Sequence, residues 1–319
     1  MVTRKSPLIA LASIIAAAVL VCGVFSQSIP QEGAICAIDM GSNTFRRIVG
    51  SFHNGQYVQR PIEKKAMGVG DDVAQHGRIS EPKLTEIGAV LSAFRSSCLR
   101  DGATRVVAVG TAAFRDAPNG GRVRGIAAKA GVDMEIASER RESELAYLVA
   151  SLGRDDHAVI DHGSRSIELV SKSAGTLSYL VSSLGYRVAY EKFFAAESDP
   201  KAAVSRYRDQ LGRQAAKASF MKGKKTLVGV EFGEMIEVLF GSADVEKRVL
   251  TRQQLRDRLA QITEGGQSGF ITLKQTTDID RALPRLVAAE FLTAAFGYSS
   301  IELTERELGS GLIIEAGIR

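Results

Sequence analysis

The segment Val159-Ile-Asp-His-Gly-Ser-Arg-Ser-Ile-Glu-Leu-Val170 has the pattern of a buried strand, a tight polar turn and a second strand. Asp161 ends the apolar part of the first strand, and Glu168 lies in the second. The turn consists of small residues and hydrogen-bond donors, namely Gly163, Ser164, Arg165 and Ser166. Such a turn can hold a phosphate and its metal ion, because backbone N–H groups face the anion and the carboxylate faces the cation. Taken alone, the segment is equally consistent with a plain β-hairpin.

A second segment, Ala34-Ile-Cys-Ala-Ile-Asp-Met-Gly-Ser-Asn-Thr-Phe45, repeats this order. Asp39 ends its apolar strand, and the polar turn that follows holds Gly41, Ser42 and Asn43. Two such turns about 120 residues apart indicate two similar lobes with a phosphate site between them.

Length and composition fit this organisation. The chain has 319 residues, which favours about two domains, and its hydrophobic (45%) and charged (24%) fractions are those of a globular protein. The formal charge of +5 is mildly basic, which would favour a polyanionic ligand. The sequence contains no cluster of aromatic and basic residues and no nucleic-acid-binding motif, so it predicts no nucleic-acid partner. It leaves the oligomeric state open.

The three cysteines, Cys22, Cys36 and Cys98, have no metal-binding spacing. Cys22 belongs to the N-terminal segment, so Cys36–Cys98 is the one disulfide that the rest of the chain can form. We expect buried free thiols instead.

Residues 1–30 are predicted to be a targeting segment rather than part of the fold. Arg4 and Lys5 precede an uncharged run over residues 7–25, and small polar residues follow it. This is the pattern of a signal peptide, but the run is also long enough to form a single N-terminal membrane anchor. Both alternatives place the remaining chain outside the cytoplasm, either exported to the periplasm or anchored to the outer face of the membrane. A wrongly assigned start codon in front of a cytoplasmic protein is the third alternative.

From residue 34 onward, strands and helices alternate. Asn54-Gly55 predicts a hairpin turn, and the polar, Gly-rich residues 64–77 predict a loop. Ser80 is a good N-cap, and Pro82 suits the first turn of the helix that follows. Further on we expect a buried strand over residues 105–111, a helix over 125–130, a strand over 132–136 and a helix over 139–152 that carries Glu142.

Four blocks, over residues 39–46, 109–115, 136–148 and 159–168, occur in the order seen in the exopolyphosphatase/guanosine pentaphosphate phosphohydrolase (Ppx/GppA) phosphatase family. Residues 183–188 and the tail from 285 to 313 also resemble this family, so the resemblance covers residues 34–319. It implies an α/β fold of two ribonuclease H-like lobes, as in the actin/hexokinase-like ATPase superfamily, with the active site in the cleft. We assign residues 34–150 to the first lobe and 151–319 to the second, and we expect that the last helix can pack back on the first lobe.

The resemblance also implies a chemistry, in which Mg²⁺ assists the attack of water on the terminal phosphoryl group of polyphosphate or guanosine pentaphosphate. By resemblance, Glu142 is the base that orients or deprotonates the water, and Arg115 clamps a phosphate oxygen. Asp161 and Glu168 would hold the metal, with Asp39 facing them from the other lobe. The phosphate-binding residues would be the two polar turns, which hold Gly41, Ser42, Asn43, Gly163, Ser164, Arg165 and Ser166.

The second lobe departs from the family pattern. Ser164 and Arg165 replace two glycines, which would permit a positive φ and a close approach of the backbone to phosphate. Arg141 replaces a glutamate next to Glu142. Residues 228–234 have lost the family's Gly-Gly-Thr-type turn, and we expect Glu231 and Phe232 there to crowd or repel a nucleotide. His162 is expected to point away from the site.

Three functions are therefore considered. The first is an exported phosphohydrolase, which the retained Glu142, Asp161 and Glu168 favour. The second is a pseudoenzyme that binds polyphosphate or another polyanion through arginines, namely Arg46, Arg115 and Arg165. The third is a sugar or nucleotide kinase of the same superfamily, which the ordered blocks favour least. Export favours polyphosphate over guanosine pentaphosphate, because the latter is a cytoplasmic molecule.

Overall fold

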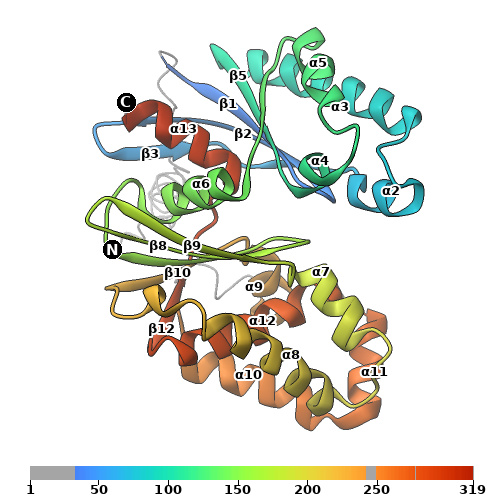
Figure 1. Ribbon diagram of the computed structural model, residues 1–319, viewed down its shortest axis with the longest axis vertical. Coiled ribbons are helices and arrows are strands. Elements are labelled where there is room, and N and C mark those ends of the chain that lie inside the picture. The colour runs from blue at the N-terminus through green and yellow to red at the C-terminus, as the bar shows by residue number, and fades with distance from the viewer. Residues whose placement is uncertain (1–32, 242–248, 277, 319) are drawn as a thin grey trace, which may run out of the picture.

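The computed structural model describes residues 33–241, 249–276 and 278–318, and these form two α/β lobes (Figure 1). The predicted signal peptide or membrane anchor, residues 1–30, lies outside the described residues. Within the three described ranges, no helix has the length and apolar character needed to cross a membrane.

The first lobe is built on a mixed sheet with the strand order β3-β2-β1-β5-β6, and β4 also pairs with β2. Its strands are β1 (Ile35–Met40), β2 (Thr44–His53), β3 (Gln56–Gln59), β4 (Glu63–Ala66), β5 (Arg105–Gly110) and β6 (Asp133–Ile136). Its helices are α2 (Val69–His76), α3 (Glu81–Arg100), α4 (Ala112–Asp116) and α5 (Arg122–Lys129). Side chains alternate along β1, so that Ile38 packs toward α3 while Ala37 packs against Ile313 on the opposite face.

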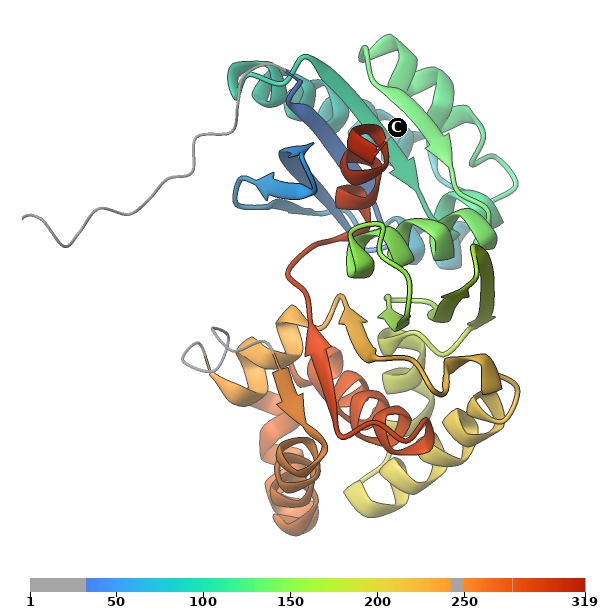
Figure 2. The ribbon, with the colours of Figure 1, turned by 90° about the vertical axis from the view of Figure 1, so that its left-hand side faces the viewer.

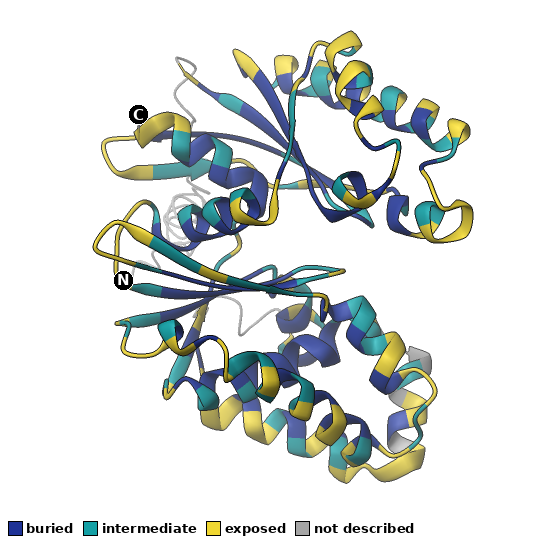
Figure 3. Ribbon diagram, in the orientation of Figure 1, coloured by how far each residue is buried: buried dark blue, intermediate teal, exposed yellow. Residues whose placement is uncertain are grey.

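The second lobe carries a sheet with the strand order β11-β12-β10-β7-β8-β9. Its strands are β7 (His157–His162), β8 (Ile167–Ser173), β9 (Thr176–Ser182), β10 (Thr226–Val230), β11 (Val249–Thr251) and β12 (Ser300–Leu303). Its helices are α7 (Tyr186–Ala189), α8 (Pro200–Ala215), α9 (Gly233–Phe240), α10 (Arg252–Glu264), α11 (Gly266–Thr276) and α12 (Ile279–Ala295), with a π-helical turn at Tyr190–Phe194 and a 3-10 turn at Ser219–Met221. The helices enclose the larger of the cores, and Figure 3 shows their exposed residues on the outer side.

The two sheets repeat one topology. The order β9-β8-β7-β10-β12 of the second sheet corresponds to β3-β2-β1-β5-β6 of the first. In each sheet an antiparallel hairpin is followed by a strand that runs parallel to the first strand of that hairpin. The prediction of two similar lobes, each opening with a strand and a polar turn, is confirmed.

Helices α6 (Glu139–Ser151) and α13 (Leu308–Ile318) lie between the two sheets. Tyr147 and Val149 of α6 pack on the second sheet, whereas Leu145 packs against Val109 of the first sheet and Leu308 of α13. After β12 the chain returns to the first lobe as α13, which Figure 2 shows in red against the first sheet. The last helix therefore packs back on the first lobe, while the predicted boundary at residue 150 stays a prediction.

Most local predictions are confirmed, with one exception. Asn54 and Gly55 form the turn between β2 and β3, and Ser80 caps α3 by accepting a hydrogen bond from the Lys83 N–H. The predicted loop over residues 64–77 is wrong, because it contains most of β4 and all of α2. β4 is exposed throughout, three of its four residues are charged, and it is fixed by backbone pairing with β2, so its side chains carry no strand pattern.

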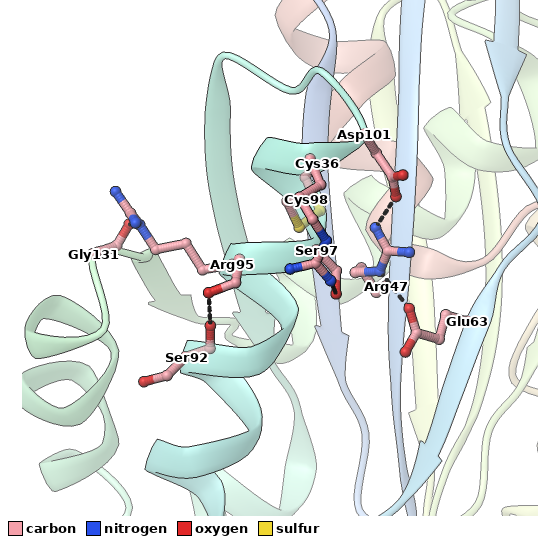
Figure 4. Close-up of a disulfide and its surroundings, with 11 residues drawn as sticks. Cys36, Arg47, Glu63, Ser92, Arg95, Ser97, Cys98, Asp101 and Gly131 are labelled. Carbon is pink, nitrogen blue, oxygen red and sulfur yellow. Dashed lines mark hydrogen bonds and ion pairs between the residues drawn. A yellow bond between two sulfur atoms is a disulfide. The ribbon is translucent and has the colours of Figure 1, made fainter.

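Cys36 and Cys98 form a disulfide, so the expectation of free thiols is wrong. The bond joins β1 to α3, and both residues are fully buried (Figure 4). Sequence spacing gave no sign of this pairing, because it depends on how α3 crosses the sheet.

Removal of the disulfide is expected to destabilise the first lobe. The bond closes a loop with a sequence separation of 62 residues, for which the chain-entropy estimate is about 4 kcal/mol. We expect the Cys36→Ala/Cys98→Ala variant to lose a stability of that order in denaturant titrations without reductant. A variant as stable as the native chain would contradict the disulfide.

Candidate functional site

The two polar turns meet in one pocket between the lobes. Strand register places Asp39 opposite Arg46 in the first hairpin and Asp161 opposite Glu168 in the second. The residues predicted for the two phosphate-binding turns and for the metal all line this pocket, and so does Glu142. The predicted residues that it brings together are Asp39, Gly41, Ser42, Asn43, Glu142, Asp161, Gly163, Ser164, Arg165, Ser166 and Glu168. Arg115 is not among the lining residues.

Both turns present unused backbone donors. The N–H groups of Ser42 and Asn43, and those of Ser164 and Arg165, donate no hydrogen bond to any part of the chain that the structure describes. Because buried or partly buried N–H groups normally find an acceptor, these donors are available to an anion in the pocket.

Asp161 and Glu168 are buried with unmet bonding capacity. Asp161 Oδ1 and Glu168 Oε1 have no hydrogen-bond partner among the described residues. Burial raises the pKa of both carboxyls well above their usual range. The second cause is the charge of Glu231 for Asp161 and the charge of Glu142 for Glu168. Oxygen ligands with uncompensated charge fit a divalent cation such as Mg²⁺.

Glu142 is held at the start of α6. Its N–H bonds the Ser138 carbonyl, and Ser138 caps the helix by accepting a hydrogen bond from the Arg141 N–H. Arg115 Nη1 donates to Glu142 Oε2 over 2.7 Å and to the Ala137 carbonyl over 3.1 Å. Burial raises the pKa of Glu142, although Arg115 opposes the shift. Arg115 therefore contacts the predicted base directly.

Sequence reasoning missed a buried cluster around Arg46. Its guanidinium lies 3.6 Å from Asp39, 3.5 Å from Glu231 and 3.4 Å from Glu307. The three carboxylates bring oxygens within 4.8 Å of one another, a spacing that can hold a metal ion, but Arg46 already lies among them as a cation. Of the acids that line the pocket, only Asp161 and Glu168 form no ion pair with a residue that the structure describes.

The sequence pattern around Glu231 could have identified it as a site residue. It directly follows the apolar strand β10, whereas Asp39 and Asp161 are the next-to-last residues of β1 and β7. It adopts a left-handed backbone with φ 65°, a strained conformation for a residue with a side chain and one that clusters at functional sites. Glu307 lies between β12 and α13 and carries no comparable pattern.

None of residues 163–166 has a positive φ, so this turn does not use the backbone freedom that the two replaced glycines would allow.

One expectation about the second lobe is wrong. Phe232 is fully buried in the core of the second lobe and does not crowd the pocket, and of the two residues only Glu231 lines it.

His162 points away from the site, as expected. It lies in the core of the second lobe, where its Nε2 is 3.2 Å from the Leu184 carbonyl oxygen. Burial, together with Arg285, lowers the pKa of His162 to about 3.

The fold and this pocket define a two-lobed α/β protein in which each lobe contributes a polar turn to an interlobe pocket that also holds a group of buried acids. The family model of Ppx/GppA phosphatases matches residues 52–305, and the chain belongs to this family.

Solved structures of similar proteins agree. The Ppx/GppA family member of Aquifex aeolicus shares 21% identity, with 89% of this chain and 97% of that chain covered and a TM-score of 0.74. An exopolyphosphatase from Cytophaga hutchinsonii shares 18% identity, with 89% and 98% covered and a TM-score of 0.70. Curated proteins gave no significant match.

Proposed function

We propose that the chain hydrolyses the terminal phosphoanhydride bond of polyphosphate, with Mg²⁺ as its cofactor. The observation that carries the proposal is the convergence, in one pocket, of free N–H donors from both turns with Glu142 and with two carboxylates that each keep one oxygen without a hydrogen-bond partner. Phosphoryl transfer needs positioning and charge neutralisation more than covalent help, and these groups supply both.

Different residues bind the phosphate chain, hold the metal ion and accept the proton. The N–H groups of the two turns bind the non-bridging oxygens of the phosphate chain. Asp161 and Glu168 hold the metal ion from the second lobe, and Asp39 faces them from the first. Bound there, Mg²⁺ would neutralise charge on the phosphoryl oxygens. Glu142 accepts a proton from the attacking water, and its raised pKa makes it a stronger base than an ordinary carboxylate.

The alternative of a pseudoenzyme that binds a polyanion requires arginines with free charge, and two of its three arginines are paired with carboxylates. Arg46 is paired with three carboxylates, and Arg115 with Glu142. Of the three, only Arg165 has no ion pair within the described chain. A pocket with more acids than free cations repels a bare polyanion, so binding without a metal ion is unfavourable.

Location bears on the substrate. We propose that the chain acts outside the cytoplasm. Residues 1–30 have the pattern of a signal peptide or membrane anchor, and the Cys36–Cys98 disulfide fits an oxidising compartment. This favours polyphosphate over guanosine pentaphosphate.

The experiment compares phosphate release from polyphosphate and from guanosine pentaphosphate, at equal phosphate concentration and with Mg²⁺. We expect faster release from polyphosphate. Release from guanosine pentaphosphate alone would overturn the substrate assignment, and release from neither would overturn the hydrolase.

Arg115→Gln is expected to shift the pH dependence of that activity. Arg115 lowers the pKa of Glu142 against the effect of burial, so its removal raises that pKa further. A base with a higher pKa is protonated up to a higher pH. The acidic limb of the kcat/KM profile should therefore move to higher pH, and the loss of activity should be larger at mildly acidic than at mildly alkaline pH. If Arg115 instead clamps phosphate, the loss will be the same at every pH and will appear in KM.

A further inference from the structure

The second phosphate turn is bonded on its outer side by a short segment, residues 185–187. The Gly185 N–H donates to the Arg165 carbonyl over 3.1 Å, the Tyr186 N–H to the Gly163 carbonyl over 2.9 Å, and the Arg187 N–H to the Ser164 carbonyl over 3.1 Å. Three consecutive carbonyls of the turn are thus held by three consecutive donors, at the point where α7 begins and its N–H groups have no partner inside the helix.

These bonds fix the direction of the opposite edge of the turn. In a planar trans peptide the N–H points away from the carbonyl of the same unit. Because the carbonyls of Gly163, Ser164 and Arg165 face α7, the N–H groups of Ser164, Arg165 and Ser166 face the other way. Those three residues line the pocket.

Gly185 permits this contact through its missing side chain. A Cβ at Gly185 would lie 2.3 Å from the Arg165 carbonyl carbon and 2.4 Å from the Ser166 nitrogen, both of which are backbone atoms. The segment is supported by Arg285, which is fully buried, stacks on the Tyr186 ring at 3.9 Å and places its Nε 3.4 Å from the His162 carbonyl.

The same segment reaches the first turn. Arg187 Nη1 donates to Asn43 Oδ1 over 3.1 Å and to Asp71 Oδ2 over 3.0 Å, and Asn43 Nδ2 donates to Ser164 Oγ over 3.0 Å. One segment of the second lobe is therefore bonded to both phosphate turns.

We propose that residues 185–187 are positioning residues that aim the N–H groups of the second turn at the phosphate chain. The inference rests on the proposed function for its ligand, but the bonding that it describes can be measured without that ligand.

The first test is amide hydrogen exchange, followed residue by residue by NMR in the metal-free chain. We expect the amides of Gly185, Tyr186 and Arg187 to exchange at least about a hundredfold more slowly than unprotected amides, and those of Ser164 and Arg165 to exchange quickly. Exchange of Tyr186 and Arg187 at unprotected rates would overturn the proposal, whether or not the chain is an enzyme.

The second test measures the dissociation constant of tripolyphosphate with Mg²⁺ by calorimetry, in a Glu142→Gln background that prevents turnover. Gly185→Ala is expected to raise the dissociation constant at least about tenfold, because several hydrogen bonds to a charged ligand are misdirected. Gly125→Ala is the control, since a Cβ there meets no atom within 4 Å, and it should change the constant less than about twofold.

The outcomes separate the two proposals. A folded Gly185→Ala variant that binds as tightly as the control overturns the positioning role, since a merely structural glycine would lower the melting temperature alone. If Gly185→Ala does not fold, the exchange rates decide. If the native chain neither binds nor hydrolyses tripolyphosphate, the proposed function fails, and the exchange rates still decide whether the segment holds the turn.

Discussion

Glu142→Gln is expected to lower the rate of phosphate release from polyphosphate about a thousandfold, the usual effect of removing a general base. The change keeps the size of the side chain, and the amide oxygen can still accept the hydrogen bond from Arg115. It removes the ability to take a proton from water. The measurement is the initial rate under saturating substrate with Mg²⁺, and KM should change little, since the N–H donors of the turns are untouched.

Glu139→Gln is the matched control for this variant. Glu139 and Glu142 are both acids of the first turn of α6, but Glu139 is exposed and Glu142 is buried. We expect Glu139→Gln to retain the native rate. Equal losses of the phosphate-release rate in the two variants would mean that the acids act through helix stability. A Glu142→Gln variant that keeps the native rate would show that Glu142 is not the general base.

Asp161→Asn is expected to abolish the response to Mg²⁺. The variant should release phosphate at least about a hundredfold more slowly, and its apparent affinity for Mg²⁺ should fall by a similar factor, because a direct ligand is lost. Asp209→Asn, an exposed acid of α8, is the control and should behave like the native chain.

Stability gives an independent measure of the same site. The pKa of Asp161 is raised in the folded chain, so in the absence of metal the native chain loses stability as the pH rises from the ordinary carboxyl range through the raised value. Asp161→Asn lacks this loss, because its amide does not titrate. In EDTA near neutral pH the variant should melt at or above the native temperature, whereas Mg²⁺ should raise the melting temperature of the native chain only. A variant that is less stable in EDTA and still stabilised by Mg²⁺ would show that Asp161 is not a ligand.

The repeated turns were predictable because their chemistry is local. A strand that ends in an acid and a Gly/Ser turn is visible in a dozen residues, and both copies form the pocket as expected. Glu142 could be placed on its helix for the same reason. The family resemblance supplied its role, which a first-turn acid does not reveal by itself.

What could not be predicted depends on contacts between distant segments. The Arg46 cluster joins residues from β2, from the end of β10 and from the start of α13, and no spacing in the sequence brings Glu231 and Glu307 together. The bonds from residues 185–187 likewise use backbone atoms, which leave no trace in residue types other than Gly185.

We propose that the interlobe pocket releases terminal phosphate with the help of a metal ion held by Asp161 and Glu168. The most direct test is the rate of phosphate release from long-chain polyphosphate by the purified native chain, with Mg²⁺ and then with EDTA. We expect steady release with Mg²⁺ and none above background with EDTA. Equal release in both conditions would contradict the metal site, and no release in either would contradict the hydrolase.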